Sequence, residues 1–217
     1  MLFVACLFAL WSPLPEALGF DFDRLRAALL ERFDTTRLPL LDRWQQTLTI
    51  ASTLPEAEKL IYINDFFNNN FYFYDDVKVW QQNDYWATPM ELIGRGEGDC
   101  EDMAIAKYYS LKEVGVATEK LRMVYVKAAV HADAGPTTLA HMVLAYYPTP
   151  NAEPLVLDNL DVQIKSASQR GDLQPIFSFN SDAVWSGVAA NSTRKEGTGQ
   201  LTRWQDLVQR ARTEGLE

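Results

Sequence analysis

Apolar residues in the first half of the chain recur at helical spacing. Phe22, Leu25, Leu29 and Phe33 lie three or four positions apart, and this period predicts a helix over 20–34. The same reasoning predicts helices over four further segments: 38–53, 54–71, 88–95 and 100–114. The segment between the third and fourth of these predicted helices is expected to be a connector with a short strand.

The pattern changes after Gly115, which can end the last of these helices. Short runs of β-branched, aromatic and aliphatic residues follow, and they predict strands within four segments: 120–130, 138–148, 154–160 and 174–187. A surface loop and then an amphipathic helix are expected over 189–200 and 202–212. Helices that precede a run of strands predict an α+β fold with an antiparallel sheet. Residues 21–217 are predicted to form a single domain.

Residues 1–20 open with an apolar run of the length of a signal-peptide core, too short to span a bilayer as a stable helix. A signal peptide is predicted, although no Lys or Arg precedes Arg24, so an ordinary N-terminal apolar segment remains the alternative. A lipoprotein anchor at Cys6 is disfavoured, because "FVAC" lacks the usual Leu. If the segment is removed, Cys100 is the one cysteine left. A lone cysteine in an exported protein is a candidate reactive thiol.

Charge narrows the class of partner. The 217 residues carry a formal net charge of -9 at pH 7. An acidic protein is repelled by nucleic acid and by anionic lipid, so neither is expected as a main partner. The same charge is compatible with divalent cations.

Cys100 lies where a chain can activate a thiol. It follows Gly94, Gly96 and Gly98 and begins a predicted helix. The N-terminus of a helix carries partial positive charge and free N–H groups, which stabilise a thiolate and can bind an oxyanion. The glycines allow a sharp turn and leave room for a substrate. Cys100 is therefore the candidate nucleophile, and a nucleophilic cysteine needs a base.

The chain offers two histidines as that base. His131 lies in a polar segment with Gly and Pro and is interpreted as a solvated loop residue. His141 lies inside an apolar strand, and Asp158 ends the next strand. If these strands are neighbours, Asp158 can reach the far nitrogen of His141, and this pairing accounts for two polar residues in apolar surroundings. Asn159 and Asp161 are the alternative orienting residues.

Three acids surround the candidate thiol: Asp99, Glu101 and Asp102. A thiol beside carboxylates is hard to ionise, because its anion is repelled. One interpretation is that the acids bind a hard cation such as Ca²⁺, which takes several oxygen ligands and would neutralise their charge. The other is that they decorate a helix N-terminus, where acids are favoured. From the residues alone both interpretations remain open.

Tyr85 and Trp86, in "NDYWATP", are aromatic residues upstream of the thiol. They could line a cleft or help to hold an oxyanion. Aromatic residues of this kind more often pack in a core, so core packing is the favoured interpretation.

The order of Cys, His and Asp segments resembles the transglutaminase-like, papain-related superfamily. "GEGDCEDMAIAKYYSLKEVG", "LAHMVLAYY" and "LVLDNL" are similar to the bacterial transglutaminase-like cysteine proteinases of the LapG type. This resemblance implies a cysteine protease fold with N-terminal helices packed on an antiparallel sheet. It also implies that Cys100 is the nucleophile, His141 the general base and Asp158 the orienting residue. Glu101 stands where many transglutaminase-like sequences have Trp.

The resemblance also implies a function. Enzymes of this type are calcium-dependent periplasmic proteases that clip a large cell-surface adhesin near its N-terminus and release it. An inner-membrane receptor for cyclic di-GMP sequesters them, which links cleavage to biofilm dispersal. Asp99 and Glu101 are then the expected calcium ligands, and Asp102 either contributes or faces inward. Two alternatives remain: an inactive transglutaminase-like binding module, and an acyltransferase or deamidase that uses the same triad.

Overall fold

The protein is described by a computed structural model that covers residues 19–132, 135–188, 193–199 and 201–216. Most of the predicted N-terminal segment 1–20 lies outside these ranges, so the signal-peptide prediction is untested. Within the described residues, no helix combines the length and the apolar character needed to cross a membrane.

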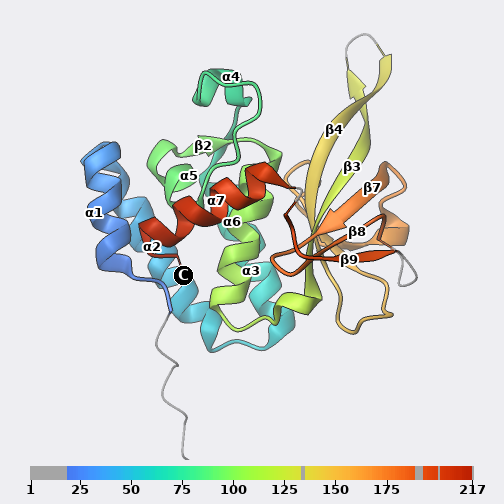
Figure 1. Cartoon of the computed structure of the whole chain (residues 1–217), viewed down its shortest axis with the longest axis horizontal. Coiled ribbons are helices and arrows are strands. Elements are labelled where there is room, and N and C mark those ends of the chain that lie inside the picture. The colour runs from blue at the N-terminus through green and yellow to red at the C-terminus, as the bar shows by residue number, and fades with distance from the viewer. Residues whose placement is uncertain (1–18, 133–134, 189–192, 200, 217) are drawn as a thin grey trace, which may run out of the picture.

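Figure 1 shows a helical part on one side of the molecule and a twisted sheet on the other. The described helices are α1 (Phe22–Arg32), α2 (Leu38–Ser52), α3 (Glu56–Asn70), α4 (Asp76–Val79), α5 (Pro89–Arg95), α6 (Cys100–Glu113) and α7 (Thr202–Glu214). Helix α6 is buried on every side, because each residue from Asp102 to Leu111 is buried. The other helices and the sheet therefore surround the element that carries the candidate nucleophile.

The main sheet has the strand order β6-β5-β4-β3-β7-β8-β9. Its strands are β3 (Leu121–Ala132), β4 (Gly135–Tyr146), β5 (Leu155–Leu157), β6 (Lys165–Ser166), β7 (Leu173–Phe179), β8 (Ala183–Trp185) and β9 (Arg194–Glu196). All neighbouring pairs are antiparallel. The predicted α+β class, with N-terminal helices packed on an antiparallel sheet, is confirmed.

Several local predictions were wrong. The connector over 75–89 contains the short helix α4, and the strand expected there lies earlier, as β1 (Tyr72–Phe73), which pairs in parallel with β2 (Glu97–Gly98). The surface loop over 189–200 contains β9. His131 belongs to β3 and not to a loop, because the β3–β4 hairpin extends further than the apolar pattern indicated. These elements are short or lack apolar residues, so burial does not mark them in the sequence.

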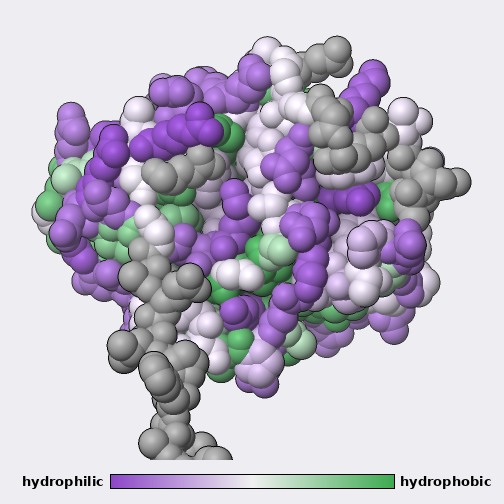
Figure 2. Space-filling model, turned by 60° about the horizontal axis from the view of Figure 1, so that its bottom comes forward, coloured by the Kyte–Doolittle hydropathy of each residue, from purple (hydrophilic) through white to green (hydrophobic). Residues whose placement is uncertain are grey.

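One core joins the two parts of the molecule. Trp44 on α2 donates a hydrogen bond of 2.9 Å from its indole nitrogen to the hydroxyl of Ser110 on α6. On the other side of α6, side chains of β3, β4 and β7 complete the same apolar cluster. The face drawn in Figure 2 is mainly hydrophilic, with smaller hydrophobic areas between the polar residues. The shared core fixes α6 against β4, which is the contact that builds the candidate site.

Two glycines shape the turn that leads into α6. Gly96 ends α5 in the left-handed region, with a φ of 73°, where glycine is favoured. At Gly98 a Cβ atom would lie 2.6 Å from Oδ2 of Asp102 and 2.7 Å from a methyl carbon of Leu92. Because Gly98 has no side chain, the buried carboxylate of Asp102 has room beside it.

Candidate functional site

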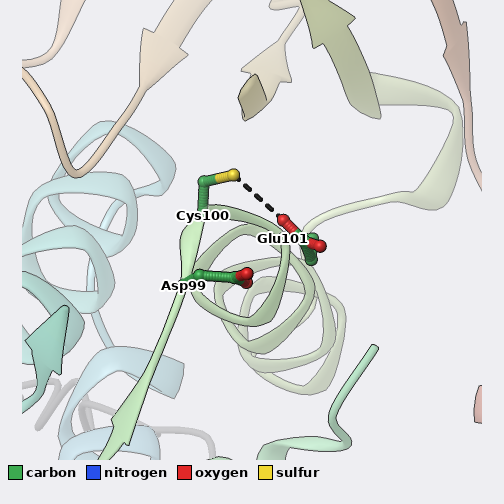
Figure 3. A group of neighbouring side chains, drawn as sticks. All are labelled: Asp99, Cys100 and Glu101. Atoms are coloured by element: carbon green, nitrogen blue, oxygen red, sulfur yellow. Dashed lines mark hydrogen bonds between the residues drawn. The ribbon is translucent and has the colours of Figure 1, made fainter. Parts of the chain in front are cut away.

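Cys100 is the first residue of α6, and Asp99 is the N-cap. The Sγ atom of Cys100 lies 3.0 Å from Oε2 of Glu101, and Figure 3 shows the thiol turned toward that carboxylate. Met142 and its neighbours on β4 line the same cleft as the sulfur. The prediction that the thiol begins a helix after a glycine-rich turn is confirmed, and β4 reaches it from the sheet.

The surroundings of the thiol oppose its ionisation. Burial raises the pKa of the Cys100 thiol well above its ordinary value, and the charge and hydrogen bond of Glu101 raise it further, followed by the charge of Asp99. The Met142 N–H acts in the opposite direction with a smaller effect. The thiol therefore needs both a proton acceptor and a positive charge near the acids before it can act as a nucleophile.

His141 and Asp158 form a buried pair. Strands β4 and β5 are antiparallel neighbours, with Leu144 opposite Leu157. This pairing places Nε2 of His141 2.7 Å from Oδ1 of Asp158, with both residues 2% exposed. The predicted contact between the two strands is confirmed.

The ionisation of Asp158 decides which nitrogen of the imidazole carries the proton. Burial opposes its charge, but the hydrogen bond and charge of His141 and then the hydrogen bond of Arg170 hold the pKa of Asp158 at about 2. An ionised carboxylate only accepts hydrogen bonds, so the proton of a neutral imidazole lies on Nε2. The free nitrogen of His141 is then Nδ1, which can accept a proton.

Neither of the two alternative orienting residues makes a hydrogen bond to His141 among the described residues. Asp161 accepts hydrogen bonds from the backbone N–H of Gln163 and from Lys165. Asn159 turns its backbone N–H toward Oδ1 of Asp158 at 2.6 Å. Asp158 is the acid that the structure brings to the imidazole, and Asn159 supports it.

Cys100 and His141 line one cleft of about 680 Å³. Trp86 forms part of its wall and stacks on Phe179, with ring centroids 5.6 Å apart. Trp86 therefore both packs on the core and lines the cleft. Tyr85 instead donates a hydrogen bond of 2.8 Å to a carboxylate oxygen of Glu91 and is not among the residues that line the cleft.

The predicted acids meet two further acids, Asp76 and Asp84, that sequence reasoning missed. One oxygen each from Asp76, Asp99 and Asp102 lie within 4.8 Å of one another, and a second group joins Asp76 to Asp84 and Glu101. Asp76, on α4, is 4% exposed, and its Oδ2 accepts the backbone N–H of Tyr85 at 2.5 Å. It lies far from Cys100 in sequence, and only the tertiary fold brings it to the cluster.

The structure shows one of the two roles that were left open for Asp102. Its Oδ1 accepts the backbone N–H of Ala87 at 2.7 Å, so it faces inward as a structural partner. Its Oδ2 is buried without a hydrogen-bond partner among the described residues, and so are Oδ1 of Asp76 and Oδ1 of Asp99. Three buried carboxylate oxygens that lack donors are unfavourable unless a cation binds them.

The ionisation of the cluster leads to the same conclusion. Burial raises the pKa of Asp76 to about 6, and it raises the pKa of Asp99 and of Asp102 well above their usual range, with the charge of Glu101 adding to each shift. The carboxylates cannot all be ionised at neutral pH without positive charge among them. Clustered carboxylate oxygens are the ligands that a hard cation such as Ca²⁺ prefers, so these residues fit that ion.

Comparisons with known proteins identify relatives of this chain. The family described as bacterial transglutaminase-like cysteine proteinase matches residues 42–176. The EGTA-treated structure of Legionella pneumophila LapG is 34% identical, with a TM-score of 0.73, and the match covers 89% of this chain and 99% of that chain. A second structure of the same protein has the same identity and coverage and a TM-score of 0.72.

The calcium-bound structure of Legionella pneumophila LapG is also 34% identical, with a TM-score of 0.70 and coverage of 87% of this chain and 98% of that chain. A comparison with curated protein sequences found no match. The family match spans more than half of the chain, and the solved structures match nearly all of it. The chain therefore belongs to the bacterial transglutaminase-like cysteine proteinase family.

Proposed function

We propose that this protein is a calcium-dependent cysteine endopeptidase in which Cys100 is the nucleophile, His141 the general base and Asp158 the orienting residue. The observation that carries the proposal is the buried hydrogen bond of 2.7 Å between His141 and Asp158, made beside a thiol in the same cleft. Nucleophile, base and orienting acid then come from α6, β4 and the end of β5. This is the arrangement that covalent catalysis by a thiol requires.

In the proposed mechanism the Cys100 thiol gives its proton to Nδ1 of His141, and the thiolate attacks the carbonyl carbon of the scissile peptide bond. The imidazolium then protonates the leaving amine as the C–N bond breaks, which leaves a thioester. A water molecule gives a proton to His141 and attacks the thioester, and the thiol regains its proton as the acid product leaves. Backbone N–H groups at the start of α6 have no helical acceptor and are available to stabilise the oxyanion.

The calcium ion is proposed to bind carboxylate oxygens of Asp76, Asp99 and Asp102. Asp84 and Glu101, which line the cleft, lie next to this proposed site. The unpartnered buried oxygens of the first three acids support this assignment, and so does the calcium-bound structure of the Legionella relative. Bound there, calcium supplies positive charge that offsets the carboxylates beside the thiol.

The proposed substrate is a large cell-surface adhesin, cleaved in its N-terminal region so that the adhesin leaves the cell. The proposed location is the periplasm, where an inner-membrane receptor for cyclic di-GMP sequesters the protease. The resemblance to LapG-type enzymes supports these three assignments, and the apolar segment over residues 1–20 supports export.

A cleavage assay tests the proposal. The protein is incubated with the N-terminal fragment of a large adhesin of the same bacterium, in the presence of calcium or of EGTA. The masses of the products are measured by mass spectrometry. We expect two fragments whose masses sum to the substrate plus one water, and no cleavage in EGTA. Binding without cleavage in calcium would indicate an inactive binding module, and a fragment carrying an added amine would indicate an acyltransferase. Either result contradicts the proposal.

Asp158→Asn is expected to lower kcat by about 10²- to 10⁴-fold, because an amide no longer favours the Nε2 proton or stabilises the imidazolium. Asp161→Asn is the matched control and should stay near wild type, since Asp161 contacts Gln163 and Lys165 and not His141. The measurement is the turnover rate of the same fragment by each variant. Equal losses from the two substitutions would leave Asp158 without the orienting role.

A further inference from the structure

A buried arginine lies behind the His141–Asp158 pair. Arg170, in the connection between β6 and β7, is 3% exposed. Its Nη2 lies 2.7 Å from Oδ2 of Asp158 and 2.8 Å from Oδ2 of Asp172, and its Nε donates to Oδ1 of Asp172 at 3.0 Å. The guanidinium thus bridges the acid that holds the imidazole and a second acid nearer the surface. The proposed mechanism assigns no role to it.

The two oxygens of Asp158 have different partners. Oδ1 contacts Nε2 of His141 and accepts the backbone N–H groups of Asn159 and Leu160, at 2.7, 2.6 and 3.1 Å. Oδ2 accepts from Arg170 at 2.7 Å, and no second donor to it is found among the described residues. Removing Arg170 would therefore leave Oδ2 unpaired on a side chain with no exposed surface.

The backbone of Asp158 is held independently of Arg170. Its carbonyl oxygen accepts Nδ2 of Asn68 at 2.9 Å and Nζ of Lys107 at 3.1 Å. These donors come from α3 and α6. Loss of Arg170 should therefore act on the carboxylate and leave the position of the chain unchanged.

Among the described residues, Arg170 is the one arginine whose guanidinium contacts the carboxylate of Asp158. Lys107 is also near, but its Nζ donates to Oδ1 of Asn68 and to the backbone carbonyl of Asp158, not to the carboxylate, and burial lowers its pKa to about 7 despite the attraction of Asp158. Arginine, in contrast, keeps its positive charge throughout the physiological pH range. The cleft beside His141 is also lined by Cys100 and Glu101 from α6, which supply no positive charge, and by Arg203, whose guanidinium is paired with Asp84 at 2.9 Å.

A buried carboxylate without a counter-charge neutralises itself by taking a proton. In this pair the proton could go to Asp158, whose hydroxyl would then donate to the ring, or to His141, which would become imidazolium. In both cases the neutral ring with its proton on Nε2 and a free Nδ1 is lost. That form is the one that can accept the proton of a thiol.

We propose that Arg170 is a positioning residue that balances the charge of Asp158, so that an ionised Asp158 can orient a neutral His141. The kinetic consequence rests on the proposed function, whereas the charge state of the ring does not. A test that reads the ring directly therefore separates failure of this inference from failure of the proposed protease activity.

The test is ¹⁵N NMR of protein labelled at histidine, in a Cys100→Ala background that removes the thiol proton. The chain has two histidines, so the His131→Gln variant assigns the signals. Nitrogen shifts distinguish the neutral Nε2–H ring, the neutral Nδ1–H ring and the imidazolium. At pH 7, with calcium present, we expect the Nε2–H form when Arg170 is intact. With Arg170→Gln we expect most of that form to be lost, and Arg170→Lys should restore part of it.

Arg122→Gln is the matched control for loss of a buried arginine. Arg122 is 8% exposed, and its guanidinium packs on the rings of Tyr147 and Trp185, with centroid distances of 4.5 and 4.0 Å. The Arg122→Gln substitution should lower the melting temperature without changing the protonation form of the His141 ring. With Cys100 restored, Arg170→Gln should lower kcat by about 10- to 100-fold with little change in KM, the size typical of residues that act through a neighbouring group. A folded Arg170→Gln protein with the wild-type ring form would overturn the inference.

Asp172→Asn keeps the test decisive if Arg170→Gln does not fold. The Asp172 side chain is 42% exposed, so the substitution should be tolerated. It removes the anion that shares Arg170 with Asp158 and leaves more positive charge for the pair. We expect His141 to keep its neutral Nε2–H form to lower pH than in the wild type. An unchanged or higher pH of protonation would count against the inference.

Discussion

Replacing Cys100 by alanine is expected to abolish proteolysis and to leave the fold intact. If the thiolate attacks the peptide bond, its loss removes the covalent route, and losses of about 10⁶-fold in turnover are typical for such a nucleophile. The thiol is half-buried at the first position of α6, where it lies against Glu101 and at the edge of the main apolar core. Truncating it should therefore cost only about 1 kcal/mol of folding free energy.

The measurement combines the cleavage assay with circular dichroism and a thermal melt of each variant. Cys100→Ser is the matched control, since it keeps a small polar side chain but replaces the thiol with a much poorer nucleophile at neutral pH. Both variants should melt near the wild type and be inactive. Normal cleavage by either would remove Cys100 from its proposed role. Loss of the folded state in both would mean that the residue is structural.

The main features of the site could be predicted because each is marked locally. Cys100 follows a glycine-rich turn and opens an apolar helix. His141 and Asp158 are polar residues within apolar strands, and the contact between them follows from the pairing of β4 with β5. The pattern of burial likewise marked the long helices and strands, because their apolar faces recur over several turns or residues.

Asp76 and Arg170 could not be predicted from such patterns. Helix α4 has four residues, too few to display a period, although Asp76 and Val79 form its buried face. Asp76 reaches the acid cluster only because the chain returns through α5 to the start of α6. Arg170 lies in a short turn between β6 and β7 and looks solvated in sequence. Its burial depends on the fold of the whole sheet.

Removal of calcium is expected to abolish cleavage and to lower thermal stability. A ligand that binds only the folded state stabilises it by about 2.7 kcal/mol when its concentration is 100 times Kd. For a domain of this size that corresponds to a rise in Tm of roughly 5 to 10 °C. EGTA should reverse this rise. Magnesium should replace calcium poorly, since a cluster of carboxylates in an irregular turn suits the larger, more flexible coordination sphere of calcium.

Substitution of the acids connects this effect to particular residues. Asp76→Asn and Asp99→Asn each remove one negative charge from the group whose buried oxygens lack donors, so each should weaken calcium binding by about tenfold or more, as ligand charge sets affinity. Asp75→Asn is the matched control. Asp75 is the exposed neighbour of Asp76 and belongs to neither acid group, so its variant should bind calcium like the wild type.

Isothermal titration calorimetry of calcium into the three variants and the wild type decides between the two explanations of the acids beside Cys100. If they form a calcium site, the wild type and Asp75→Asn give heat, and Asp76→Asn and Asp99→Asn give little. If they only favour a helix N-terminus, Asp76 should not matter, because it lies on α4 and not on α6. The wild type could instead give no heat on titration with calcium and cleave normally in EGTA. That result would show that the acids do not bind the ion and that Cys100 can form a thiolate without it.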